Sequence, residues 1–204
     1  MSEAVLETSH PTREKLIAET LVMIEEMPYE DLSAGELLRR TGVSKGSLYH
    51  HFEDYSDLLE AAYLRRFFMH VETAVAAIEM AVNTAESKEE FVGYLRDLTR
   101  ASQARSRAAH RFERARMLGK AERNERFHAT LGAMQQRQTD AFTVAITAAQ
   151  ARGWVTRDVQ ARTLAVFIQA YSIGRIVDDI TSVTMDDDDW NELIDRIVDL
   201  ALTT

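Results

Sequence analysis

Cysteine is absent from this chain of 204 residues, and proline and glycine are scarce, with two and eight residues. Without cysteine the chain forms neither a disulfide framework nor a thiolate zinc site, which fits a reducing cytoplasm. No apolar run reaches the roughly 18 residues that a membrane-spanning helix needs. Residues 1–7 also lack the basic and apolar regions of a signal peptide. We therefore expect a cytoplasmic protein that makes no membrane contact.

The scarcity of helix breakers leaves most of the chain open to helix formation. Both prolines, Pro11 and Pro28, fall at expected helix boundaries, and we find no strand pattern and no internal repeat. Apolar residues recur with the helical period from about Thr12 to Met27, which predicts a first amphipathic helix. Further helices are expected at 54–85, 87–110, 124–152, 158–184 and 187–202, with a break near Gly119. The predicted fold class is all-α.

A pair of short helices with a tight turn is predicted between residues 33 and 52. Ser33 followed by Glu36 is a capping box, so a helix begins near residue 34. Gly42 stands where that helix needs a residue that tolerates positive φ. Ser44 is a second N-cap signal, and a second helix therefore starts at Lys45. This order of signals is typical of a helix-turn-helix that reads DNA.

The second of these helices is the candidate recognition helix. Leu48 and Phe52 are four residues apart and can anchor one face to a core. Gly46 costs roughly 1 kcal/mol relative to alanine inside a helix, and close approach to a DNA backbone is one reason to keep it. The other faces carry Lys45, Ser47, Tyr49, His50 and His51. The alternative is an ordinary helix-helix turn on which these side chains are incidental surface residues.

The string from Gly42 to Leu59 resembles the signature of the tetracycline-repressor-like (TetR) family of bacterial transcription regulators, and the motif resemblance extends over about residues 12–66. It implies an N-terminal three-helix DNA-binding domain. In relatives with this pattern, the matching positions contact phosphates or bases: Ser33, Lys45, Gly46, Ser47, Tyr49, His50 and His51. Leu37 and Leu38 replace the usual Ile-Ala pair. Tyr55 replaces a common lysine, so we expect weaker backbone binding and a shallower salt dependence, although the Tyr55 hydroxyl can still donate one hydrogen bond.

The charge of the chain is unusual for a DNA-binding protein. The formal net charge is −9 at pH 7. Between Ser33 and His51, however, Arg39, Arg40 and Lys45 stand against Glu36 alone. We predict a locally basic reading surface on an acidic protein, which favours selective binding over general association with polyanions.

We divide the chain into a helix-turn-helix domain at 1–53 and a helical effector-binding and dimerisation domain at 54–204. The last two predicted helices carry more apolar positions than one buried stripe requires. This pattern and the family resemblance imply a homodimer formed through a four-helix bundle, which would read a palindromic DNA operator with recognition helices about 34 Å apart. The predicted interface residues are Phe167, Ile168, Ile180, Trp190, Leu193 and Ile197. The alternative is a well-buried monomer core.

The middle helices mix apolar, aromatic and polar residues in a way that suits a small-molecule effector pocket. Ordinary core packing explains the aromatic residues equally well. The candidate effector-binding residues are Leu95, Leu98, Phe112, Met134, Gln138, Phe142, Tyr171 and Arg175. Residues 96–126 also hold nine arginines. These are interpreted as surface salt-bridge partners of Glu113, Glu122 and Glu125, or else, at Arg100, Arg105 and Arg111, as ligands for an anionic effector.

No arrangement typical of catalysis is found. The sequence offers no nucleophile triad, no phosphate-cradling loop, no paired catalytic carboxylates and no paired histidine spacing for a metal in the helical body. The acids at 186–189 lack the spacing of an EF-hand loop. We therefore predict a transcriptional regulator without cofactor or metal, most simply a repressor released from DNA by a small-molecule effector. The alternatives are an activator, an effector-independent regulator, or a helical interaction protein that no longer binds DNA.

Overall fold

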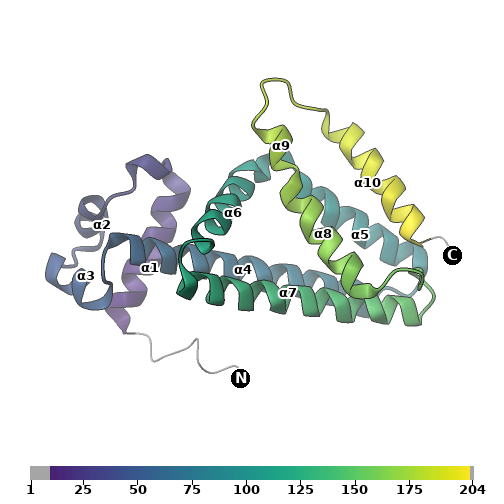
Figure 1. The fold of residues 1–204 in the computed structure, drawn as a ribbon, viewed down its shortest axis with the longest axis horizontal. Helices are drawn as coiled ribbons and strands as arrows, with labels where there is room; N and C mark the ends of the chain where they lie inside the picture. The colour runs from purple at the N-terminus through teal and green to yellow at the C-terminus, as the bar shows by residue number, and fades with distance from the viewer. Residues whose placement is uncertain (1–9, 203–204) are drawn as a thin grey trace. The chain divides into compact units, whose positions relative to one another are not determined.

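A computed structural model describes residues 10–202, and all regular elements in this range are helical, as Figure 1 shows. The α-helices are α1 (Pro11–Glu26), α2 (Ala34–Thr41), α3 (Lys45–His51), α4 (Tyr55–Thr84), α5 (Lys88–Gln103), α6 (Ala108–Ala121), α7 (Glu125–Ala151), α8 (Ala161–Gly174), α9 (Ile176–Asp179) and α10 (Asp187–Leu202). Short 3-10 turns lie at Tyr29–Asp31 and Arg105–Arg107. The all-α prediction is confirmed. No helix in the described range is long and apolar enough to cross a membrane, and the signal-peptide prediction concerns residues outside it.

The chain forms two compact units, and the division between them falls inside α4, after Met69. Helices α1, α2 and α3 belong to the first unit together with the first turns of α4. The reason is burial, because Leu58 and Ala62 of α4 are fully enclosed in the same core as Leu16 of α1 and Leu48 of α3. The boundary predicted before residue 54 therefore lies earlier than the division that packing produces.

The second unit is built from the rest of α4 and the helices that follow. Helices α7 and α8 pack side by side, and α6 contacts both of them (Figure 1). Its apolar core takes residues from four helices and from the loop after α7: Ile78, Val82, Phe91, Val92, Ala145, Ile146, Ala149, Val155 and Ala165. The Phe91 ring lies 5.5 Å from the Trp154 ring, centroid to centroid, at the edge of this core. Helix α10 contacts α5.

The helix predicted over 87–110 is wrong at its end. Helix α5 stops at Gln103, Ala104 is extended (φ −50°, ψ 144°), and α6 then continues through the predicted break at Gly119. The carbonyl of Gln103 accepts a hydrogen bond from Arg175, and that of Ala104 accepts one from Arg111 at 3.4 Å. Guanidinium groups from α6 and from the end of α8 thus satisfy the carbonyls where α5 ends. A local reading of the sequence does not contain that information.

The helix predicted over 158–184 is also wrong, because it is shorter and divided. Helix α8 ends at Gly174, and α9 ends at Asp179. Beyond it, the Asp178 carboxylate accepts from the amide of Met185 at 3.1 Å, and the Thr181 hydroxyl donates to the Asp178 carbonyl at 2.8 Å. Side-chain hydrogen bonds to the backbone thus favour a loop here.

Candidate nucleic-acid interface

The predicted turn between α2 and α3 is present in the first unit. The Ser33 hydroxyl accepts from the amide of Glu36 at 3.3 Å, and the Ser44 hydroxyl accepts from the amide of Ser47 at 3.1 Å. Gly42 adopts the left-handed conformation, with φ 67°. These caps confirm both helix starts and the position of the turn. Lys15 of α1 adds a contact, because its ammonium donates to the carbonyl of Thr41 at 2.7 Å.

Helix α3 has one buried face and one polar face. Leu48 is fully buried, Phe52 just beyond the helix is 3% exposed, and both belong to the same apolar core as Leu37 of α2. The anchoring role predicted for Leu48 and Phe52 is thus confirmed. The opposite side presents Lys45, Gly46, Tyr49 and His50 as exposed residues, with Ser47 and His51 partly exposed. The result is a short polar helix held by its apolar side.

Gly46 has no structural reason within the protein. A Cβ atom there meets only the Ser44 hydroxyl oxygen, at 4.0 Å, which is an ordinary contact. Its backbone is also outside the left-handed region, in contrast to Gly42. Glycine destabilises a helix relative to alanine. No contact within the protein explains why position 46 carries no side chain.

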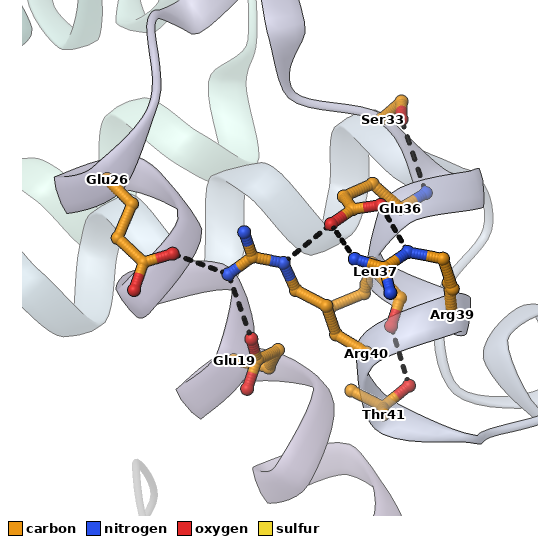
Figure 2. Close-up of polar contacts among 8 residues, drawn as sticks. All are labelled: Glu19, Glu26, Ser33, Glu36, Leu37, Arg39, Arg40 and Thr41. Atoms are coloured by element: carbon orange, nitrogen blue, oxygen red, sulfur yellow. Dashed lines mark hydrogen bonds and ion pairs between the residues drawn. The ribbon is translucent and has the colours of Figure 1, made fainter.

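The Glu36 side chain of α2 has different hydrogen-bond partners from those predicted. The Glu36 carboxylate turns toward arginine, accepting from Arg39 Nε at 2.8 Å and Nη2 at 2.6 Å, and from Arg40 Nε at 2.8 Å, as Figure 2 shows. Only the serine half of the predicted capping box is therefore seen. The hydrogen bonds from Arg39, and then those from Arg40, lower the pKa of Glu36 to about 2.

Arg40 is also tied to α1. Its Nη1 lies 2.6 Å from a Glu26 carboxylate oxygen and 3.4 Å from a Glu19 oxygen, and the side chain is 24% exposed (Figure 2). Glu36 is the only acid between residues 33 and 51, but α1 brings two further acids to Arg40 and so reduces the predicted local positive charge. Arg40 fastens α2 to α1, and Lys45 remains the cation at the start of the exposed helix.

The position of Tyr55 changes a second expectation. Its hydroxyl is buried and has no hydrogen-bond partner among the described residues, and the side chain packs against the core of the first unit. Burial raises the pKa of Tyr55 to about 12. The predicted hydrogen bond from this hydroxyl to a DNA phosphate is therefore not supported, because the oxygen is turned away from solvent.

The predicted interface residues of the C-terminal helices fall into two groups. Phe167, Ile180 and Leu193 are exposed, at 46%, 70% and 49%. Ile168 packs against the core of the second unit, and Trp190 and Ile197 are partly buried. Prediction from sequence missed four exposed apolar residues on the same part of the chain: Val166, Val177, Val183 and Leu200.

The predicted effector residues are spread over the second unit. Leu95 and Phe142 pack against its core, and the Tyr171 hydroxyl lies 3.2 Å from the Thr99 hydroxyl. The carbonyl oxygen of the Gln138 side chain is buried without a hydrogen-bond partner in the described structure. Leu98, Phe112 and Met134 are partly buried.

The arginines of this unit are used mainly in ion pairs within the protein. Arg175 is fully buried and donates to Asp187 and to the Gln103 carbonyl, so it holds the ends of three helices together. Arg100 pairs with Asp195 at 2.8 Å, and Arg111 pairs with Asp179 at 2.5 and 2.8 Å. Arg100 and Arg111 thus form salt bridges, but the predicted glutamate partners are wrong: the partners are Asp195 of α10 and Asp179 of α9, and Arg111 is buried and not on the surface. Arg105 donates to the carbonyl of Met185 at 2.9 Å.

A partly buried chain of polar side chains connects α6, α7 and α8, and prediction from sequence missed it. Arg114 donates to Gln135, and Gln135 donates to Gln169. Gln169 then donates to the Thr139 hydroxyl at 3.1 Å and to the Ala165 carbonyl at 2.9 Å. Burial lowers the pKa of Arg114 to about 10. In the sequence, these residues can be recognised only as polar residues that interrupt the apolar stripes of the helices.

A short polar helix anchored across two others, joined by a tight glycine turn, is the geometry of helix-turn-helix proteins. Residues 16–62 match the family described as bacterial regulatory proteins, tetR family. This match covers the helix-turn-helix unit, so residues 16–62 are similar to the matching segment of tetR-family bacterial regulators.

Curated relatives match the same part of the chain. A regulator named HTH-type transcriptional regulator BetI from Pectobacterium atrosepticum is 35% identical over 78 residues, covering 37% of this chain and 40% of that protein. The protein of the same name from Proteus mirabilis is 37% identical over 76 residues, covering 37% and 38%. The match thus spans about 40% of the length of these relatives.

Solved structures resemble nearly the whole chain in fold. A TetR/AcrR-family regulator from Thermobifida fusca has a TM-score of 0.67 at 15% identity, covering 93% of this chain and 97% of its own. Salmonella enterica GusR has a TM-score of 0.66 at 20% identity, covering 97% and 98%. A protein from Saccharomonospora viridis, solved in complex with choline, has a TM-score of 0.67 at 18% identity, covering 92% and 95%. At these identities the likeness concerns the fold alone.

Proposed function

We propose that this protein is a sequence-specific DNA-binding transcriptional regulator that acts in the cytoplasm. The observation that carries the proposal is the two-faced α3, whose apolar side is anchored while its polar side is exposed around Gly46, a glycine that the protein itself does not need. Lys45, Ser47 and Tyr49 supply hydrogen-bond donors for phosphates and base edges. Because Arg39 and Arg40 are ion-paired with acids, we expect fewer phosphate contacts and a shallow dependence of affinity on salt.

The test begins with selection of bound duplexes from a random DNA library. Affinity for the selected site is then measured by fluorescence anisotropy for Lys45→Ala and Tyr49→Ala. The matched control is Arg126→Ala, which removes an exposed positive charge from α7. Loss of affinity in the α3 variants with unchanged folding and unchanged control supports the proposal. Wild-type affinity in both α3 variants would favour the alternative of an interaction protein that no longer binds DNA.

We further propose that the regulator is a homodimer that joins through α8, α9 and α10. Large apolar side chains stay exposed there, including Phe167, Val177 and Ile180, whereas single apolar residues are the usual case on a soluble surface. Pairing this face with its symmetry mate buries them and places two recognition helices on one palindromic operator.

A matched pair of substitutions tests the dimer. Ile180 and Val144 are both 70% exposed. Ile180 lies at the end of α9, and Val144 lies on α7. We expect Ile180→Glu to give monomers in sedimentation velocity and to weaken operator binding, while Val144→Glu leaves both unchanged. A dimer that survives substitution of both Ile180 and Phe167 by glutamate would refute this interface.

We propose that a small-molecule effector releases the protein from DNA by binding among α5 to α8. The partly buried polar chain from Arg114 to Gln169 and the Gln138 oxygen, which has no partner among the described residues, supply orienting groups between apolar walls. To shift the DNA-competent state from 99:1 to 1:99, the effector must prefer the other state by about 10⁴-fold. We favour a repressor that responds in this way over an activator or an effector-independent regulator, and the assay below tests whether DNA binding depends on an effector.

The effector proposal is tested by thermal-shift screening, with choline as the first compound because one neighbour in fold was solved with it. Compounds that raise the melting temperature are then tested for release of the selected duplex. Gln138→Leu should weaken the response, whereas Gln136→Leu, an exposed residue on the same helix, should not. Compounds that bind without changing DNA affinity would indicate effector-independent regulation.

A further inference from the structure

Three histidines lie together where α1 begins and α3 ends. The ring centroids of His10 and His51 are 4.5 Å apart, and those of His50 and His51 are 5.0 Å apart. Arg13 lies beside them, with its guanidinium carbon 5.2 Å from the centroid of the Phe52 ring. His50 is exposed and His51 is partly exposed, so the cluster meets solvent at the C-terminal end of the recognition helix.

The charges around this cluster disfavour a further proton in the free protein. Partial burial lowers the pKa of His51, and the proximity of His10, His50 and Arg13 lowers it further. Glu14, on the same helix as Arg13, lies 3.8 Å from Arg13 and 2.9 Å from Arg65 of α4.

The acids that follow α3 are Glu53, Asp54 and Asp57. The Asp54 carboxylate accepts from the amide of Asp57, and the Asp57 carboxylate accepts from the amide of Glu53. These two carboxylates are thus used at the start of α4. Among the described residues no carboxylate forms an ion pair with these three imidazoles, and no group of three or more His, Cys, Asp or Glu is placed to hold a metal ion.

The hydrogen bonding of His10 assigns different roles to the rings. His10 Nδ1 accepts from the amide of Thr12 at 3.3 Å and thereby caps α1. An accepting Nδ1 has no hydrogen, so the neutral ring of His10 carries its hydrogen on Nε2 and is a donor there. Protonating His10 would break the cap. This leaves His51, whose ring lies against those of both His10 and His50, as the site for an added proton.

We propose that His10, Arg13, His50 and His51 form a phosphate-binding site that takes up a proton when DNA binds. This inference rests on the proposed function, and it adds the start of α1 to the helix-turn-helix surface. A DNA phosphate oxygen supplies a counter-ion, and it accepts hydrogen bonds from the Nε2 of His10 and from the imidazolium of His51. The proton comes from solvent and stays on the imidazole while the duplex is bound.

The sign of the pH dependence follows from linkage. Without DNA, partial burial and the neighbouring groups hold the pKa of His51 below its usual 6.5, so the His51 ring is mostly neutral at pH 7. A bound phosphate favours the imidazolium and raises that pKa, so association takes up a proton between the two values. Affinity therefore increases as pH falls through the range around 6.5. For one coupled proton the maximum change is about tenfold per pH unit.

The experiment measures the dissociation constant of the selected duplex from pH 5.5 to 7.5 at constant ionic strength. We expect tighter binding at low pH for the wild type. His51→Gln should be flat over this range and should bind at pH 5.5 no better than the wild type at pH 7.5. His128→Gln, at an exposed histidine of α7, is the control that should retain the wild-type slope. His10→Ala should weaken binding at every pH, since it removes a neutral donor.

A second measurement separates proton uptake on DNA binding from any folding defect in the variants. Calorimetry in buffers with different ionisation enthalpies counts the protons taken up on binding, which is expected to be close to one for the wild type and none for His51→Gln. Binding that is independent of pH, with no proton uptake, would overturn this inference and leave the proposed function intact. Failure of the wild type to bind any duplex at any pH would overturn both.

Discussion

Replacing Gly46 by alanine should stabilise the protein and weaken DNA binding at the same time. The added Cβ meets only the Ser44 hydroxyl oxygen at 4.0 Å, so the methyl group fits the free protein without strain. Glycine in a helix costs about 0.5–1 kcal/mol relative to alanine. For a chain of this size that gain corresponds to a rise in melting temperature of about 1–4 °C. On DNA the same methyl group occupies the space into which the backbone of α3 approaches a phosphate or base edge, and a tenfold loss of affinity corresponds to about 1.4 kcal/mol.

Two assays on one sample test this reasoning, namely thermal unfolding followed by circular dichroism and fluorescence anisotropy with the selected duplex. Gly132→Ala is the matched control, because Gly132 lies on the exposed side of α7 and a Cβ there meets nothing within 4 Å. It should stabilise to a similar extent and leave DNA affinity unchanged. A Gly46→Ala protein that is more stable and binds DNA as well as the wild type would refute the argument that DNA requires this glycine.

Further predictions concern buried and paired groups. Asp179→Ala should reduce the free energy of unfolding by about 3–5 kcal/mol in urea titration, because it leaves Arg111 without its counter-ion in a site where the two side chains are 5% and 4% exposed; a loss below about 1 kcal/mol would contradict this. Glu36 should titrate near pH 2 when followed by NMR. Its contribution to the free energy of unfolding should be complete above pH 4.5 and should be lost as pH falls toward 2. In the Arg39→Ala, Arg40→Ala double variant the titration midpoint should move toward 4.5. Tyr55→Phe should leave DNA affinity unchanged, since its hydroxyl is buried, and a clear loss would show that the hydroxyl reaches DNA.

The sequence predicted the helix-turn-helix well because its signals are local. Ser33, Gly42 and Ser44 act through their own backbone conformation or through amides three residues away, and Leu48 is placed by the period of one short helix. Such interactions depend on neighbours in the chain, so they can be predicted without knowledge of the tertiary structure. The polar face of α3 follows from the same period.

The pairing of charged side chains on that surface could not be predicted from local signals in the same way. Arg40 looked like a free cation until α1 placed Glu19 and Glu26 beside it, and Tyr55 looked accessible until its hydroxyl was enclosed. In both cases the deciding partner is distant in sequence. The histidine cluster is another example, because His10 and His51 are neighbours only after α1 and α3 have packed.

By itself, the sequence determined that this chain is all helical, that it has an N-terminal helix-turn-helix, and where its caps and glycine turns lie. The tertiary structure alone decided where α5 and α8 end, which arginines are neutralised, and which apolar side chains remain exposed. The physical reason is the range of the interactions. Helix period and capping act within a few residues, whereas the carbonyl of Gln103, the guanidinium of Arg175 and the carboxylate of Asp187 meet only when three helix ends converge.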